Sequence, residues 1–188
     1  MALTAVDPTP ALVVIDLQKG IVAARTDSQA TAAVKRAAHL SAEFRRHGLP
    51  VVLVNVTGRA PGRTEAQRPG SGVALPSGWA DLIDELDVRP SDHLITKRRR
   101  SAFHDTGLDT LLRDLGVTQT VLAGIATSSG VESTARSAHD HGYHVVLATD
   151  AMTDPDADAH RHSVERVFPK LGETATTTEI VDMIEATR

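Results

Sequence analysis

The sequence predicts an α/β fold in three layers, a Rossmann-like arrangement in which helices cover both faces of a parallel sheet of about six strands. Short, continuous apolar runs such as PVVLVNV recur along the chain, as in strands that are buried on both faces. Between these runs lie segments with apolar residues at helical spacing. Strands that alternate with helices in this way are typical of parallel sheets.

The expected elements follow in order. The first strand, 11–18, is an apolar run that contains an acidic residue near its end, and the helix over 28–47 has apolar residues at helical spacing until His47 and Gly48 close it. Four more apolar runs indicate strands, at 50–56, 93–97, 120–126 and 144–151. Three more stretches indicate helices, near 107–115, near 130–141 and over 158–168, before Pro169. A last short strand and helix are expected within 174–186.

One domain is expected over residues 1–188, because a chain of 188 residues can bury a single core. The stretch 57–79 is the one irregular segment, and it is rich in Gly, Pro and Arg. A loop of this length in a compact domain is usually functional or mobile. It is therefore a candidate lid over a binding site.

Composition narrows the class of protein. The net charge of −4, with acidic and basic residues interspersed, argues against nucleic acid as the main partner. The absence of cysteine excludes disulfides, zinc–thiolate sites and a thiol nucleophile. The opening residues MALTAVDPTP lack the features of a signal peptide, and no apolar run reaches the ~18 residues that span a bilayer. We therefore expect a cytoplasmic protein without membrane contacts.

Several residues whose side chains could bind a ligand or take part in catalysis lie at the ends of the predicted strands. In open parallel sheets, ligands bind beyond the carboxyl ends of the strands. Those ends bring together an acid, a lysine and a helix-opening turn from distant parts of the sequence, at Asp16, 55–59, Lys97, 126–130 and Asp150. The sequence therefore predicts a ligand site at this edge of the sheet.

Four segments resemble the isochorismatase-like hydrolase superfamily, which also contains nicotinamidases and N-carbamoyl amidohydrolases. LVVIDLQKG resembles its first strand, and LITKRRRSAFHDTGLDTLLRDLG is similar to the stretch that contains its lysine. VLAGIATSSGVESTARSAHDHGYHVVLATDAMTD resembles its nucleophile segment, and HSVERVFPKLGETATTTEI fits its last strand and helix. The resemblance covers nearly the whole chain and implies that Asp16 is catalytic and that Lys97 is its electrostatic partner.

Residue 130 departs from the pattern of most amidases in this superfamily, which have a cysteine nucleophile there. Gly130 excludes the usual thiol-dependent hydrolysis. The isochorismatases of phenazine and siderophore pathways form a branch that also has glycine at this position; they hydrolyse a vinyl ether and release pyruvate. Resemblance to that branch implies that Asp16 acts as a general acid and that Gly130 leaves room in the site.

To act as a general acid at neutral pH, Asp16 needs a pKa above that of an ordinary aspartic acid. An ordinary aspartic acid has a pKa near ~3.9 and is ionised at neutral pH. Burial and a bound anionic substrate would raise the pKa of Asp16, whereas the nearby cation of Lys97 would lower it. The mechanism requires burial and substrate charge to outweigh Lys97.

The candidate lid offers cations for a small anionic substrate. Arg59, Arg63 and Arg68 are spaced so that at least one can clamp a carboxylate by a two-pronged contact. The stretch EAQRPG resembles the surroundings of a lid arginine in the glycine-type isochorismatases, which makes Arg68 the preferred anchor. Arg59 falls where those enzymes have a pocket glutamine, so isochorismate itself is not implied as the substrate.

Further binding residues are expected around the turn. The Ile125–Ala126 bond matches a place where the family often has a cis peptide, which would orient backbone donors into the pocket. The N–H groups of Ser129 and Gly130 are expected to bind an anionic oxygen at the start of the helix. Trp79, at the end of the candidate lid, is expected either in the core or facing the pocket.

Other features are interpreted as structural. The arginines at 98–100 are interpreted as a solvated basic edge, and Ser128 and Ser129 as turn residues. His139 and His141 lie two positions apart on a predicted helix and so do not share a face. The stretch NVTGRAPG lacks the D-x-H pair through which nicotinamidases bind metal. No metal and no cofactor are therefore expected.

Three functions remain open. The first is an isochorismatase-like hydrolase of a small anionic molecule, independent of metal, with Asp16 as the acid. The second is an amidase-like hydrolase in which Asp16 activates water directly. The third is a catalytically silent paralogue that binds a metabolite or a protein partner. A homo-oligomer, a dimer or larger, is expected because members of this superfamily commonly form such assemblies.

Overall fold

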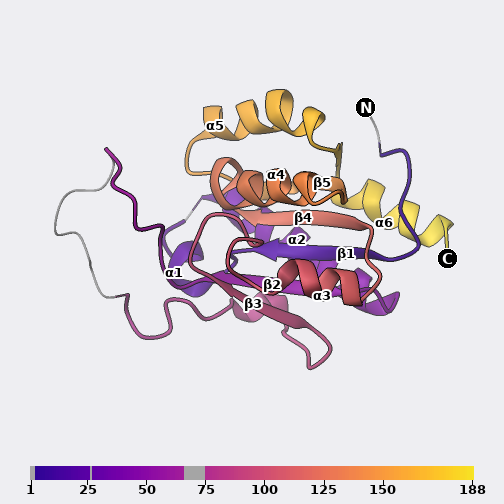
Figure 1. Ribbon diagram of the computed structural model, residues 1–188, viewed down its shortest axis with the longest axis horizontal. Coiled ribbons are helices and arrows are strands. Elements are labelled where there is room, and N and C mark those ends of the chain that lie inside the picture. The colour runs from indigo at the N-terminus through magenta and orange to yellow at the C-terminus, as the bar shows by residue number, and fades with distance from the viewer. Residues whose placement is uncertain (1–2, 26, 66–74) are drawn as a thin grey trace.

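The computed structural model describes residues 3–25, 27–65 and 75–188. Within these residues, six strands form one parallel sheet in the order β3-β2-β1-β4-β5-β6, which confirms the predicted fold class (Figure 1). The strands are β1 (Pro10–Ile15), β2 (Val51–Val56), β3 (His93–Lys97), β4 (Gln119–Ile125), β5 (His144–Thr153) and β6 (Glu173–Ala175).

Helices connect these strands. The α-helices are α1 (Lys19–Val22), α2 (Ser28–Arg46), α3 (Leu108–Asp114), α4 (Glu132–Asp140), α5 (Ala157–His162) and α6 (Thr177–Ala186). Shorter helical turns are η1 (Asp84–Leu86), η2 (Thr127–Val131), η3 (Ser163–Val167) and η4 (Phe168–Lys170). Of these, α1 and η1 were not expected from the sequence, because neither is long enough to show a periodic pattern.

Helices cover the sheet on both faces, with α3 and α4 in front of it and α2 behind it in Figure 1. On one face, Leu40 and Phe44 of α2 and Ile184 of α6 pack on the sheet and are fully buried. On the other face, Leu112 of α3 and Ala135 of α4 do the same. The sheet therefore has two apolar clusters, one on each face, and its central strands β1, β2 and β4 are apolar over most of their length for this reason.

Two predicted elements end earlier than expected. The strand predicted over 11–18 ends at Ile15, because Asp16 has a φ of 53° and turns the chain out of the sheet. Asp is one of the few non-glycine residues that adopt this left-handed conformation readily. The helix predicted over 158–168 is α-helical only to His162 and continues as η3 and η4 towards Pro169. Proline and its steric effect on the preceding residue disfavour a regular helix end there.

The strand order reverses between β1 and β4, which is where ligands bind in open α/β sheets. Gly124 allows these two strands to approach closely, because a Cβ atom on it would lie 2.0 Å from the carbonyl oxygen of Ile15. Its φ of +122° also favours glycine. Asp16 and the turn after β4 therefore begin side by side at this edge.

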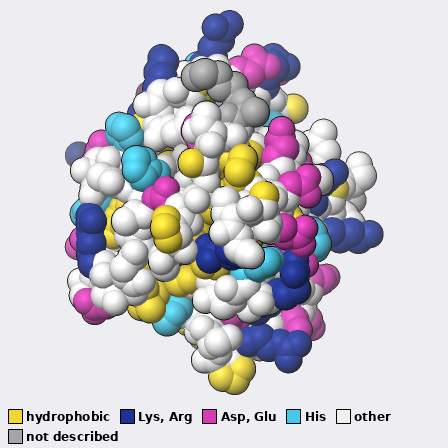
Figure 2. Space-filling view, turned by 90° about the vertical axis from the view of Figure 1, so that its right-hand side faces the viewer, with side chains coloured by type: hydrophobic (Ala, Val, Ile, Leu, Met, Phe, Trp, Pro, Cys, Tyr) yellow, Lys and Arg dark blue, Asp and Glu magenta, His cyan; other side chains and the backbone are white. Residues whose placement is uncertain are grey.

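The opposite end of the molecule, at the amino ends of the strands, has acidic, basic and histidine side chains interspersed over its surface (Figure 2). No field of a single sign is visible on that face. None of the helices in the described residues combines the length and the apolar character that a membrane-spanning helix needs.

Candidate active site

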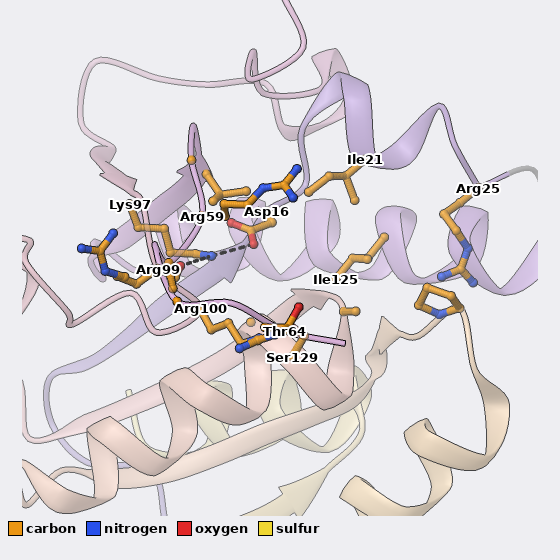
Figure 3. Close-up of a pocket in the computed structure, with 17 residues that line it drawn as sticks. Asp16, Ile21, Arg25, Arg59, Thr64, Lys97, Arg99, Arg100, Ile125 and Ser129 are labelled. Atoms are coloured by element: carbon orange, nitrogen blue, oxygen red, sulfur yellow. Dashed lines mark hydrogen bonds and ion pairs between the residues drawn. The ribbon is translucent and has the colours of Figure 1, made fainter. Parts of the chain in front are cut away.

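A cavity of about 330 Å³ opens at the carboxyl ends of the strands (Figure 3). Its walls come from the ends of β1, β3 and β4, from α1, and from the segment after β2. Six of the residues predicted as site residues line it, namely Asp16, Arg59, Lys97, Ala126, Ser129 and Gly130. Segments far apart in the sequence thus meet at the carboxyl ends of the strands, where the sequence predicts a ligand site.

The side chains of Asp16 and Lys97 form a buried ion pair at the bottom of this cavity. Lys97 Nζ donates hydrogen bonds to Asp16 Oδ2 over 2.8 Å and to the carbonyl oxygen of Arg99 over 3.1 Å. Lys97 is 2% exposed and Asp16 is 5% exposed. The other carboxyl oxygen, Asp16 Oδ1, is buried and accepts no hydrogen bond from the described residues. Lys97 therefore holds one oxygen of the carboxyl group, and the other is left without a protein partner among the described residues.

Burial raises the pKa of Asp16 to about 6, although the charge and the hydrogen bond of Lys97 act to lower it. Burial therefore outweighs Lys97, as the acid role requires. A pKa of about 6 leaves about a tenth of the carboxyl groups protonated at pH 7. A bound anion in the cavity would shift the pKa further upwards.

Gly130 faces this carboxyl group. A Cβ atom at residue 130 would lie 3.2 Å from Asp16 Oδ2 and 2.9 Å from Ile15 Cγ2. A side chain here would therefore point at the acid and crowd the end of β1. The absence of one leaves space beside the carboxyl group for a ligand.

The turn η2 that contains Gly130 is held by Asp154, a residue that the sequence patterns did not single out. Asp154 Oδ2 accepts hydrogen bonds from the N–H and the hydroxyl of Ser128, each over 2.8 Å. Ser128 is thus a turn residue, as expected.

The Ile125–Ala126 peptide bond is cis, as the resemblance implies. The Ser129 N–H, however, donates to the carbonyl oxygen of Ala126. The expectation that it binds an anionic oxygen is wrong for this conformation, because the turn already uses it.

The cavity is richer in cations than expected from the sequence. Arg99 and Arg100 line it, and Arg99 is half-buried, so the interpretation of 98–100 as a solvated edge is wrong for Arg99. Arg100 is exposed, as expected, but it also borders the cavity. The reason lies in the chain direction after β3: the carbonyl oxygen of Arg99 turns back to Lys97 Nζ, which holds this segment at the cavity wall. In Figure 3, Arg59 and Arg100 lie on opposite sides of Asp16. Arg25 also lines the cavity.

The remaining predicted binding residues lie elsewhere or are not described. Arg68 lies outside the described residues, so its role as substrate anchor stays a prediction. Trp79 is not among the described residues that line the cavity; it packs on α1, where a Cβ atom on Gly20 would lie 1.9 Å from Trp79 Cδ1. The described parts of 57–79 contain neither helix nor strand, and Thr64 reaches the cavity. Closure of this segment as a lid stays a prediction.

Comparison with known proteins agrees with this geometry. The family model described as the isochorismatase domain matches residues 10–179. The chain belongs to the isochorismatase family. It is 39% identical over 181 residues to the isochorismatase family protein YwoC of Bacillus subtilis, covering 93% of this chain and 94% of that one.

Solved structures place it in the same family of hydrolases. An isochorismatase family protein from Burkholderia thailandensis has a TM-score of 0.90 and 37% identity, covering 96% of this chain and 98% of that chain. N-carbamoylsarcosine amidase from Thermoplasma acidophilum has a TM-score of 0.75 and 29% identity, covering 90% and 96%. The protein is an isochorismatase-like hydrolase.

A candidate metal-ligand group does exist among the described residues, but away from the cavity. Glu43, His47 and Glu185 bring potential ligand atoms within 4.8 Å of one another. None of them lines the cavity, and Arg46 pairs with both glutamates. The expectations of no metal and no cofactor stay predictions.

Proposed function

We propose that this isochorismatase-like hydrolase cleaves the vinyl ether of a small anionic metabolite and that Asp16 is its general acid. The observation that supports this most is the Asp16 carboxyl group itself. It is buried, its pKa is raised to about 6, and its Oδ1 has no partner among the described residues. Such a group can hold a proton and donate it into the cavity.

The reaction balances with water as the only co-reactant. Asp16 Oδ1 gives its proton to the terminal carbon of the vinyl ether, and the electron pair of the double bond forms the new C–H bond. The carbon that bears the ether oxygen becomes an oxocarbenium ion, to which water adds. The resulting hemiketal loses the alcohol by cleavage of the C–O bond, which leaves a keto acid, and Asp16 regains a proton from the added water.

Lys97 and the arginines support this sequence electrostatically. Lys97 pairs with Asp16 Oδ2 and so stabilises the carboxylate that forms as the proton leaves. Arg59 and Arg100 line the same cavity and can bind a carboxylate of the substrate. The bound carboxylate offsets part of their charge, which favours the protonated form of Asp16 before reaction.

A second candidate is hydrolysis of an amide or related bond, with Asp16 as a base that activates water. It is favoured by the pKa of about 6, which leaves most of the Asp16 carboxyl groups ionised at pH 7. N-carbamoylsarcosine amidase, among the structural neighbours, has the same fold. The two candidates require opposite protonation states of the same side chain.

The pH dependence of kcat/KM separates them. An acid must be protonated in the free enzyme, so kcat/KM for a vinyl-ether substrate, with isochorismate as the first probe, should be constant well below pH 6 and fall about tenfold per pH unit above it. Pyruvate release, followed with a coupled lactate dehydrogenase assay over the range from about pH 4.5 to 8.5, measures this. A rate that instead rises through pH 6 contradicts the acid role. Ammonia release from a panel of amides tests the second candidate. If the protein turns over neither isochorismate nor any of the amides, the third function, a catalytically silent binding protein, is favoured.

A further inference from the structure

Arg25 lines the end of the cavity that is remote from the acid. Arg25 follows α1, whereas Asp16 follows β1, and the two lie well apart in Figure 3, with Ile21 and Ile125 between them. The cavity therefore has cationic groups at both ends. Lys97, Arg59 and Arg100 surround the reacting end, and Arg25 is at the far end.

The guanidinium of Arg25 is fixed in place but incompletely paired. Its Nε donates to Asp27 Oδ2 over 2.9 Å, and its Nη2 donates to the carbonyl oxygen of Asp154 over 3.1 Å. Its Nη1 is buried and has no hydrogen-bond partner among the described residues. A guanidinium has five N–H donors, and an unpaired buried donor is costly. A planar oxyanion is the ligand that would satisfy the remaining donors.

The wall between the two ends is apolar. Ile21 and Ile125 project into the cavity there. Apolar side chains in this position favour a hydrocarbon or ring in the middle of the ligand, because its burial removes apolar surface from water. Two apolar side chains thus lie between the two cationic ends.

We propose that Arg25 binds a second anionic group of the ligand, so that the cavity selects an elongated acid with oxyanions at both ends of an apolar body. Asp27 and the carbonyl oxygen of Asp154 hold the guanidinium in position, and the ligand completes its hydrogen bonds. The proposal rests on the proposed function only for the statement that the reacting end lies at Asp16. Arg25 is in this account a specificity-determining residue.

Isothermal titration of the full chain with benzoate and terephthalate tests the proposal. Terephthalate has carboxylates at opposite ends of an apolar ring, and benzoate lacks one of them. A charge-assisted hydrogen-bonded contact is expected to make terephthalate bind at least about tenfold more tightly than benzoate. Arg25→Gln should remove this difference by weakening terephthalate alone.

Arg36→Gln is the matched control. Arg36 also pairs through Nε with an aspartate carboxylate, Asp150, and through a terminal nitrogen with a carbonyl oxygen, but it does not line the cavity. This variant removes the same charge and should leave both affinities unchanged. Arg25→Lys keeps the charge without the planar fork and should weaken terephthalate selectively. If thermal unfolding shows that Arg25→Gln does not fold, the affinities of Arg25→Lys for terephthalate and benzoate test the proposal instead.

The inference is overturned if wild-type protein binds the two acids equally or binds neither, or if the Arg25 variants weaken both acids to the same extent. None of these measurements needs turnover. A protein that shows the contrast but releases no pyruvate therefore retains this inference and loses the proposed function.

Discussion

Replacing Asp16 with asparagine is expected to lower kcat/KM for isochorismate by about 10²–10⁴-fold, the usual contribution of a general acid. Asparagine has nearly the same shape and keeps an oxygen that can accept from Lys97 Nζ, but it cannot donate a carboxyl proton. The loss should therefore fall mainly on kcat. Pyruvate release under steady-state conditions measures it, and circular dichroism with thermal unfolding checks that the variant is folded.

Asp150→Asn is the control for this experiment. Asp150 is another aspartate near the sheet edge, and its Oδ1 accepts hydrogen bonds from the N–H and the hydroxyl of Thr177. It does not line the cavity. This variant should keep wild-type turnover. Turnover that persists in Asp16→Asn at the wild-type rate would show that the proton comes from another group.

Gly124→Ala is expected to destabilise the protein by about 3 kcal/mol or more. The new Cβ atom would lie 2.0 Å from the carbonyl oxygen of Ile15, and the alanine would also have to adopt a φ of +122°. Since both obstacles are backbone features, no side-chain rotation relieves them. β1 and β4 must separate beside Asp16, so activity should fall with stability. Urea denaturation followed by circular dichroism measures the change.

Gly116→Ala separates the two obstacles. Gly116 has a φ of +68°, but a Cβ atom added to it would meet no described atom within 4 Å, so only the backbone conformation opposes the substitution. The expected cost is about 1 kcal/mol. Equal destabilisation by the two variants would mean that the close approach of β4 to Ile15 contributes nothing to the larger cost expected of Gly124→Ala.

The fold was predictable because its central strands are buried on both faces. Runs such as 50–56 and 120–126 are apolar for that reason, and the helix over 28–47 shows its buried stripe in the positions of Leu40 and Phe44. Element ends were less predictable. The end of β1 depends on the left-handed conformation of Asp16, which is set by tertiary contacts, and η3 depends on how the chain approaches Pro169.

The site was predictable where a residue follows a strand directly or ends it, as Asp16 and Lys97 do. Arg25 was missed because it lies outside the recognisable motifs and reaches the cavity through the path of the chain. Asp154 ends one of the segments that resemble the superfamily, but it lies beyond the strand predicted over 144–151, and only the fold brings its carboxylate to the turn. The run of arginines after β3 did carry a signal, since a strand end at Lys97 makes the residues after it candidates for the same edge. Its interpretation failed because charge runs are usually solvated.

The net shift in the pKa of Asp16 could not be predicted from the sequence. The sequence shows that burial and Lys97 act in opposite directions, but their relative size depends on how deeply the pair is buried. Exposures of 5% for Asp16 and 2% for Lys97 explain why burial has the larger effect.

Infrared difference spectroscopy of the ligand-free protein over the range from about pH 4 to 8 tests this balance most directly. The carbonyl stretch of a protonated carboxyl group, assigned to Asp16 by its absence in Asp16→Asn, should titrate with a midpoint near pH 6. A carboxyl group that is already ionised at about pH 4 would contradict the acid role, because it would show that Lys97 dominates and that Asp16 holds no proton to donate.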